Sequence, residues 1–150
     1  MSSLNTVKKN MLIEEIKNYL ENYENILFAI LFGSYASGKT NNKSDLDIGI
    51  CTDQEINMLK LGKIITDIEK ITDLKIDLIE LNNLFNKSPL LAYQITANHK
   101  VIFVRDETAL VNFKRMTLLN YFDTSELRKT VNTAFYNRIS EKKFGKRNYA

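Results

Sequence analysis

The chain has 150 residues, of which 44% are hydrophobic and 26% charged, and its formal net charge is +3, as expected for one ordinary globular domain. No apolar run approaches the roughly 20 residues that span a bilayer, and the N-terminal stretch lacks the apolar core of a secretory signal, so we expect a cytoplasmic protein. A single cysteine, Cys51, and a single histidine, His99, exclude an internal disulfide and a zinc site built from these residues.

The first third of the chain predicts a helix followed by two strands. Apolar residues recur at helical spacing over residues 5–22, which predicts an amphipathic helix. The run ILFAILF, residues 26–32, is short and unbroken and ends at a glycine, which favours a buried strand. A polar loop over residues 33–44 then leads to a second strand, DLDIGIC, at residues 45–51.

A helix and a third strand follow. Thr52 and Glu55 have the spacing of a capping box, which predicts that a helix of about fifteen residues begins after them. The stretch LKIDLIEL, residues 74–81, alternates and is rich in isoleucine and leucine, so it predicts the third strand.

The remaining chain predicts helices around one more strand. Ser88 and Pro89 are typical of an N-cap and a first helical position. KVIFV, residues 100–104, predicts the fourth strand, and the rest is helical, with Asp123 and Glu126 as the expected cap of a last helix.

This order of elements predicts an α/β (α+β) fold, a mixed sheet of about four strands backed by helices. We expect one domain over residues 1–150, with a core at about residues 10–105 and a helical C-terminal extension at about residues 106–145.

The stretch GSYASGKT, residues 33–40, matches the phosphate-binding pattern of P-loop enzymes at every fixed position. In those enzymes the lysine and threonine open a helix, whose first amides hold the phosphates. Residues 41–44 are poor helix formers here, and a strand follows at once. The match is therefore interpreted as chance.

Three aspartates indicate a different site. Asp45 and Asp47 are two apart on a predicted strand, so their carboxylates project from the same face, and Asp77 lies within the next strand. If these strands are neighbours, three negative charges converge and need cations between them, which is the pattern of a two-Mg²⁺ phosphoryl-transfer site. Each aspartate also has an alternative: a turn cap, a lysine partner or an exposed sheet edge.

The signature G-S-x(10)-D-x-D, formed by Gly33, Ser34, Asp45 and Asp47, resembles that of the DNA polymerase β-like nucleotidyltransferases, and Asp77 stands where the third carboxylate of this family is expected. The resemblance extends over about residues 10–125 and is greatest to the minimal nucleotidyltransferases, or MNT proteins. It implies a polymerase β palm-like nucleotidyltransferase fold and Mg²⁺-dependent transfer of a nucleoside monophosphate, with release of pyrophosphate.

The resemblance also implies residue roles. Asp45, Asp47 and Asp77 would be the catalytic residues and would hold two Mg²⁺ ions, and Asp77 would draw the proton from the attacking hydroxyl.

Nucleotide binding would involve Gly33 and Ser34, which would hold the triphosphate of ATP. Many MNT proteins carry an arginine where this chain has Ser37; either Lys39 supplies the missing charge or the affinity for the nucleotide is weak.

Many MNT proteins are antitoxins that transfer AMP to a tyrosine of a HEPN-domain ribonuclease, so the resemblance implies a protein adenylyltransferase with such a toxin as partner and with no membrane or DNA partner. Transfer to a small molecule or an RNA end, and neutralisation by contact alone, remain alternatives. From Arg105 onward the chain holds ten Lys and Arg against five Asp and Glu; this charge offers a contact for an acidic partner or RNA, although most such charge is simply a solvated face. Aromatic residues of this part offer a docking surface, although helical spacing is more typical of core residues: Phe113, Tyr121, Phe122, Phe135 and Tyr136.

Overall fold

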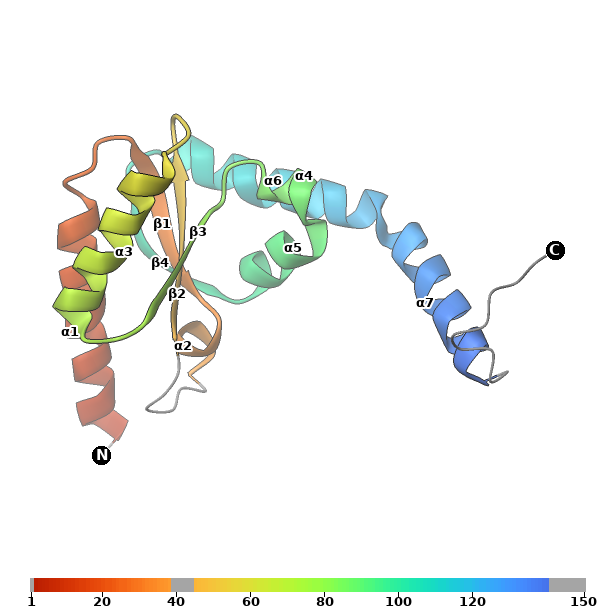
Figure 1. The fold of residues 1–150 in the computed structure, drawn as a ribbon, viewed down its shortest axis with the longest axis horizontal. Coiled ribbons are helices and arrows are strands. Elements are labelled where there is room, and N and C mark those ends of the chain that lie inside the picture. The colour runs from red at the N-terminus through yellow and green to blue at the C-terminus, as the bar shows by residue number, and fades with distance from the viewer. Residues whose placement is uncertain (1, 39–44, 141–150) are drawn as a thin grey trace.

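The structure of the protein is a computed structural model that describes residues 2–38 and 45–140 (Figure 1). At its centre lies a sheet in the order β3-β2-β1-β4, formed by β1 (Ile26–Phe32), β2 (Leu46–Thr52), β3 (Ile76–Glu80) and β4 (His99–Val104). β1 pairs antiparallel with β2 and β4, whereas β2 and β3 are parallel. The predicted mixed sheet of four strands is therefore confirmed.

Helices cover both faces of this sheet (Figure 1). The helices are α1 (Ser2–Leu20), α2 (Ser34–Ser37), α3 (Met58–Thr72), α4 (Leu84–Lys87), α5 (Pro89–Ala97), α6 (Glu107–Asp123) and α7 (Ser125–Ser140). On one face α1 and α3 pack side by side over a buried cluster that includes Ile16, Leu31 and Ile48. On the other face α5 and α6 pack over a second cluster, which includes Phe28 and Phe113. Two apolar cores therefore lie back to back across the sheet.

The central position of β1 explains its composition. Ala29 and Leu31 belong to the first cluster, and Phe28 and Ile30 belong to the second. A strand covered by helices on both faces reads as a continuous apolar run rather than as an alternation. β1 has the predicted bounds because this run stops at both ends where the chain leaves the cores.

Helix α3 joins the two parallel strands β2 and β3 and has the predicted length of 15 residues, but its start was predicted wrongly. The side chain of Asn57, not of Thr52, caps it by accepting a hydrogen bond from the Lys60 N–H (2.8 Å). Thr52 is still the last residue of β2, and its hydroxyl donates to the carbonyl of Gln54 (2.6 Å). The sheet thus holds Thr52 too early for it to act as the cap that its spacing with Glu55 predicted.

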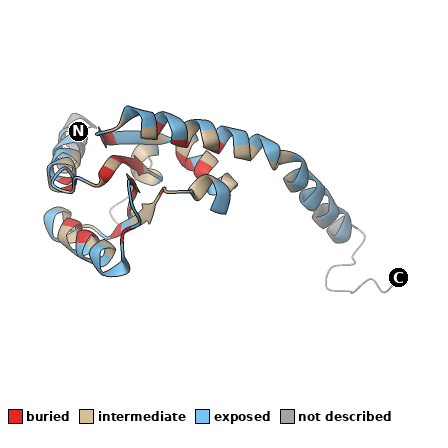
Figure 2. Ribbon diagram, turned by 90° about the horizontal axis from the view of Figure 1, so that it is seen from above, coloured by how far each residue is buried: buried red, intermediate tan, exposed pale blue. Residues whose placement is uncertain are grey.

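The predicted cap at Asp123 is also wrong, because Asp123 is the last residue of α6. Thr124 separates the two helices, and its N–H and hydroxyl both donate to the carbonyl of Asn120 (3.1 and 2.9 Å). α7 then extends from the end of α6 away from the sheet (Figure 1), and most of its described residues are exposed (Figure 2), whereas Ser125 and Arg128 are half-buried. The short helices α2 and α4 were not predicted, since four residues are too few to establish a helical period.

Arg105 fastens the end of β4 to the turn between α1 and β1. Its guanidinium donates to the carbonyls of Glu21 (2.7 Å), Tyr23 (2.7 Å) and Ile26 (2.5 Å). The next residue, Asp106, caps α6 by accepting from the N–H groups of two residues in its first turn. The Arg-Asp pair therefore has a structural role in placing α6 on the sheet.

Candidate active site

The end of β1 lies against the start of β2. Phe32 pairs with Asp47 in the antiparallel ladder, so Gly33 follows directly beside this aspartate. Gly33 has φ +71° and ψ −149°, a conformation that other residues rarely adopt, and a Cβ atom on it would stand 2.1 Å from Asp47 Oδ2. The backbone of residue 33 approaches the carboxylate this closely only because it is glycine.

A short turn of helix follows Gly33. In α2 the N–H groups of Ala36 and Ser37 donate to the Gly33 carbonyl (both 3.1 Å), and Gly38, at φ +78°, ends the helix. The first N–H groups of such a turn, here those of Ser34 and Tyr35, have no carbonyl one turn earlier to accept their hydrogen bonds. Backbone donors therefore stand beside Gly33, next to the Asp47 carboxylate.

The carboxylates come from two neighbouring strands. Asp47 of β2 and Asp77 of β3 are paired in register in the parallel ladder, so both side chains project from the same face of the sheet, on strands about 4.8 Å apart. Asp45 precedes Asp47 by two residues at the mouth of β2 and is exposed, as Asp77 is, whereas Asp47 is half-buried. The three predicted aspartates thus lie at the same end of the neighbouring strands β2 and β3.

This arrangement changes the pKa of Asp47. Burial raises the pKa of its carboxyl group above the usual value, and the negative charges of Asp77 and Asp45 raise this pKa further. A cation bound between these carboxylates would lower the pKa of Asp47 and so oppose the effect of the two neighbouring negative charges.

The oxygen donors of Asp45, Asp47 and Asp77 fit a hard cation such as Mg²⁺. Within residues 2–38 and 45–140, however, no group of three or more His, Cys, Asp or Glu side chains is gathered closely enough to hold a metal ion. The ligands would be the carboxylates of Asp45, Asp47 and Asp77, which the strands bring to neighbouring positions but do not gather around one point.

Of the residues predicted to bind the nucleotide, Gly33 and Ser34 lie at the end of β1 beside Asp47, and Lys39 lies outside the described residues. Ser37, at the place of the family arginine, donates its hydroxyl to the Ser34 carbonyl (3.1 Å) and so closes the turn of α2 instead of adding a charge.

The P-loop interpretation disagrees with this geometry. The helix at the phosphate-binding pattern begins at Ser34, before the lysine and threonine of the pattern, and it ends at Gly38. β2 already begins at Leu46, which leaves too few residues after Lys39 for the long helix that a P-loop needs.

A cavity of about 390 Å³ adjoins Gly33 on the side away from Asp77. It is lined by Phe32, Gly33 and Ser37 and by Leu91, Gln94, Ile95 and Asn98 from α5 and its end. These α5 residues were not predicted from the sequence, because exposed amides on a helix are usually solvated and only the tertiary structure brings them to the glycine turn.

Residues 14–108, more than half of the chain, match the family model "Polymerase beta, Nucleotidyltransferase". The chain belongs to this nucleotidyltransferase family. The match covers both the glycine turn and the three aspartates, so the predicted family, and with it the expected enzyme class, is confirmed.

Individual members of the family are similar along most of their length. Protein adenylyltransferase MntA of Aphanizomenon flos-aquae is 30% identical over 111 residues, which cover 67% of this chain and 72% of that protein. A solved toxin-antitoxin structure with AMP-PNP has a TM-score of 0.68 at 20% identity, covering 81% of this chain and 96% of that chain. The structure of the tri-AMPylated HEPN toxin of Shewanella oneidensis in complex with MNT antitoxin has a TM-score of 0.67 at 18% identity, covering 85% of this chain and 98% of that chain. These structures share the nucleotidyltransferase fold with this chain.

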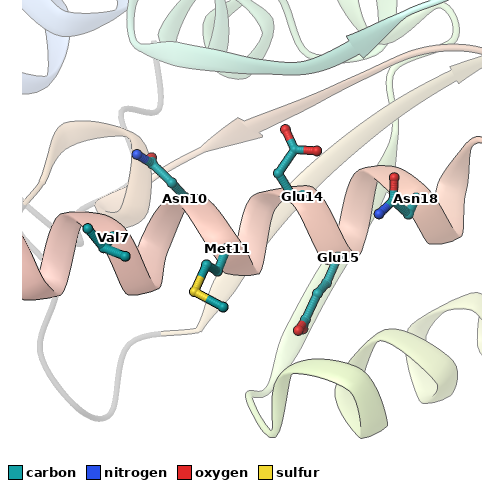
Figure 3. A pocket seen from close by; sticks show the side chains of 6 residues that line it. All are labelled: Val7, Asn10, Met11, Glu14, Glu15 and Asn18. Atoms are coloured by element: carbon teal, nitrogen blue, oxygen red, sulfur yellow. The ribbon is translucent and has the colours of Figure 1, made fainter.

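A second hollow, of about 420 Å³, lies along α1 and involves no residue of the signature. Figure 3 shows its lining, all from one helix: Val7, Asn10, Met11, Glu14, Glu15 and Asn18.

Among the described helices none has both the length and the apolar character needed to cross a membrane.

Proposed function

We propose that this protein transfers AMP from ATP to a tyrosine hydroxyl of a HEPN-type ribonuclease toxin and thereby acts as its antitoxin. The observation that carries the proposal is the close approach of Gly33 to Asp47, which stands in register with Asp77, in a chain of the nucleotidyltransferase family. The adenylyltransferase relative and the AMPylated HEPN toxin complex support the choice of nucleotide and acceptor.

Each signature residue has a chemical role in this proposal. The amides and hydroxyl at Ser34, with Lys39, bind the triphosphate, and the glycine at position 33 lets its oxygens approach Asp47. Asp45, Asp47 and Asp77 would hold two Mg²⁺ ions, which supply positive charge to the attacking and leaving oxygens when bound.

The reaction balances without a further co-reactant. The acceptor oxygen attacks the α-phosphorus, a new P–O bond forms, and the bond to the β-phosphate breaks and releases pyrophosphate. Asp77 receives the proton of the hydroxyl, because it lies on the edge strand β3 and is exposed, and is therefore open to an entering protein. The added AMP is a bulky anion, which repels RNA from the active site of the toxin.

The proposal includes a docking surface on the C-terminal helices. Of the aromatic residues predicted there, Phe113 is buried in the core and Tyr121 stacks on Tyr93 (3.8 Å between ring centroids), so neither is available to a partner. Phe122 is 62% exposed, and Leu127 and Val131 of α7 are also exposed, whereas the side chains of residues 135 and 136 lie outside the described part. This apolar strip, Phe122, Leu127 and Val131, is the surface that we assign to the toxin.

The reaction belongs in the cytoplasm, where ATP and Mg²⁺ are available and the single thiol, Cys51, stays reduced. Two alternatives use the same chain differently: the nucleotide goes to a small molecule or an RNA end, or the protein silences its partner by contact alone.

Intact mass spectrometry separates these possibilities. The product of the neighbouring gene is incubated with this protein, ATP and Mg²⁺. The same incubation is made with an Asp45→Asn/Asp47→Asn variant and with Asp53→Asn, which replaces an exposed aspartate just after β2. We expect a gain of one or more AMP units with the wild type and with Asp53→Asn only. A toxin that is silenced by the double variant without any gain in mass contradicts the enzymatic account and favours contact alone.

A further inference from the structure

The cavity beside Gly33 has the composition of a ligand pocket. Its volume of about 390 Å³ lies in the range of small-molecule sites, which are mostly apolar with a few polar groups. Phe32, Leu91 and Ile95 give it apolar walls, and Gln94 and Asn98 give it two carboxamides. No intramolecular hydrogen bond of these two amide groups occurs within the described residues, so both are free to bind a ligand.

The strand order places this cavity relative to the reacting groups. Across the sheet, Asp77 lies on β3, Asp47 on β2, and Phe32 and Gly33 at the end of β1. The cavity begins at Phe32 and Gly33, so it lies on the opposite side of Asp47 from Asp77. In the proposed reaction the acceptor hydroxyl has to reach Asp77, which leaves the cavity to the other substrate.

The polar groups of the cavity indicate which part of that substrate it takes. A carboxamide both donates and accepts, and a purine base presents adjacent donors and acceptors on one edge and flat apolar faces on either side. A tyrosine ring offers a single hydroxyl, which the reaction needs elsewhere.

We propose that the cavity binds the purine base of the nucleotide, with Gln94 and Asn98 hydrogen-bonding its edge and Phe32, Leu91 and Ile95 covering its faces. This inference rests on the proposed function, since it assumes that the triphosphate lies on the Gly33 turn. Gly33 and Ser37 line both the turn and the cavity, so a nucleotide reaches from one to the other without crossing the sheet.

Isothermal titration of the full chain with ATP, CTP and tripolyphosphate, all with Mg²⁺, tests the pocket. The variant is Gln94→Met/Asn98→Leu, which keeps side chains of similar length and removes the hydrogen bonds, and the control is Asn112→Leu, an exposed position of α6. We expect the wild type and the control to prefer ATP over CTP. The double variant should raise the Kd of ATP roughly ten- to a hundredfold and leave that of tripolyphosphate within about twofold, because tripolyphosphate has no base.

An unchanged Kd of ATP in the double variant overturns the pocket, as does an equal weakening of ATP and tripolyphosphate. A double variant that keeps its affinity for ATP but loses transfer to the toxin assigns the cavity to the acceptor and also overturns it. A wild type that prefers ATP, loses this preference in the double variant and yet modifies no protein supports the pocket and contradicts the proposed acceptor instead.

Discussion

Gly33 and Asp47 lie closer together than any residue with a side chain at position 33 would allow. A Cβ atom there would stand 2.1 Å from Oδ2 and 3.1 Å from Cγ of the aspartate. The turn proposed to bind phosphate and the carboxylate proposed to bind metal therefore form one unit, and a change in either displaces the other.

Gly33→Ala should lower both stability and activity. The methyl group meets Asp47, and φ +71° is unfavourable for alanine, which together cost at least about 1–3 kcal/mol of unfolding free energy. We expect a lower Tm and a loss of AMP transfer of roughly tenfold or more, because the Asp47 carboxylate has to move.

Gly62→Ala is the matched control for this substitution. Gly62 lies within α3 with no atom near its missing Cβ, so alanine should raise stability by up to about 1 kcal/mol and leave transfer unchanged. Equal Tm and activity of Gly33→Ala and the wild type would show that the close contact is not needed.

Asp47 should make the protein less stable as the pH rises. Its native pKa lies above the usual value, through burial and the charges of Asp77 and Asp45, so the folded state binds this proton more tightly than the unfolded state does. Stability falls from about pH 4, the unfolded pKa, up through the raised native pKa, and the loss is complete above it.

Thermal unfolding in Mg²⁺-free buffer measures this penalty. Asp47→Asn removes the charge, so its Tm should exceed that of the wild type at pH 7, and the difference should shrink towards pH 4. Asp53→Asn, at an exposed position, should show a smaller difference. A variant that is less stable than the wild type at pH 7 would mean that the neutral amide loses contacts which outweigh the repulsion.

Mg²⁺ and ATP together should stabilise the wild type. A ligand that binds only the folded state adds about 2.7 kcal/mol at a concentration one hundred times its Kd. In a thermal-shift measurement with a non-hydrolysable ATP analogue we expect a rise in Tm that requires Mg²⁺. The Asp45→Asn/Asp47→Asn variant should show no Mg²⁺-dependent rise in Tm. A Mg²⁺-dependent rise of the same size in both proteins would contradict the assignment of the metal ligands.

Arg105→Ala should reduce stability but not catalysis. The guanidinium donates to three carbonyls at the turn between α1 and β1, and hydrogen bonds to a charged group contribute about 1.5–3 kcal/mol. Chemical denaturation should show a loss of this order, with transfer at low temperature unchanged. Arg115→Ala, an exposed arginine of α6, serves as the control and should lie within about 0.5 kcal/mol of the wild type.

Val131→Asp should weaken binding to the toxin. Val131 of α7 is 58% exposed and belongs to the apolar strip, and a charge placed in an interface loses its hydration without gaining a partner. We expect the Kd of the complex to rise roughly tenfold or more, while the neighbouring, exposed Asn132→Asp has little effect. Equal affinity of the two variants would place the toxin elsewhere.

Much of the fold was predictable because its strands are marked locally. The unbroken apolar run of β1 fixed its bounds, and Pro89 marked the start of α5. The capping box at Thr52 misled because the same residue also ends a strand, and hydrogen bonding within the sheet prevailed over local capping. Gln94 and Asn98 carried no signal, since nothing in the sequence near α5 points to the glycine turn.

The sequence by itself determined the chemical groups of this protein: a Gly-Ser turn after a buried strand, two aspartates at strand spacing shortly after it, and a third aspartate within the next predicted strand. The tertiary structure alone decided that β2 and β3 are parallel neighbours, so that Asp77 stands in register with Asp47, and that α5 folds back beside Gly33. The physical reason is that side-chain alternation is a local property of a strand, whereas register and helix placement are set by burying two apolar clusters on opposite faces of one sheet.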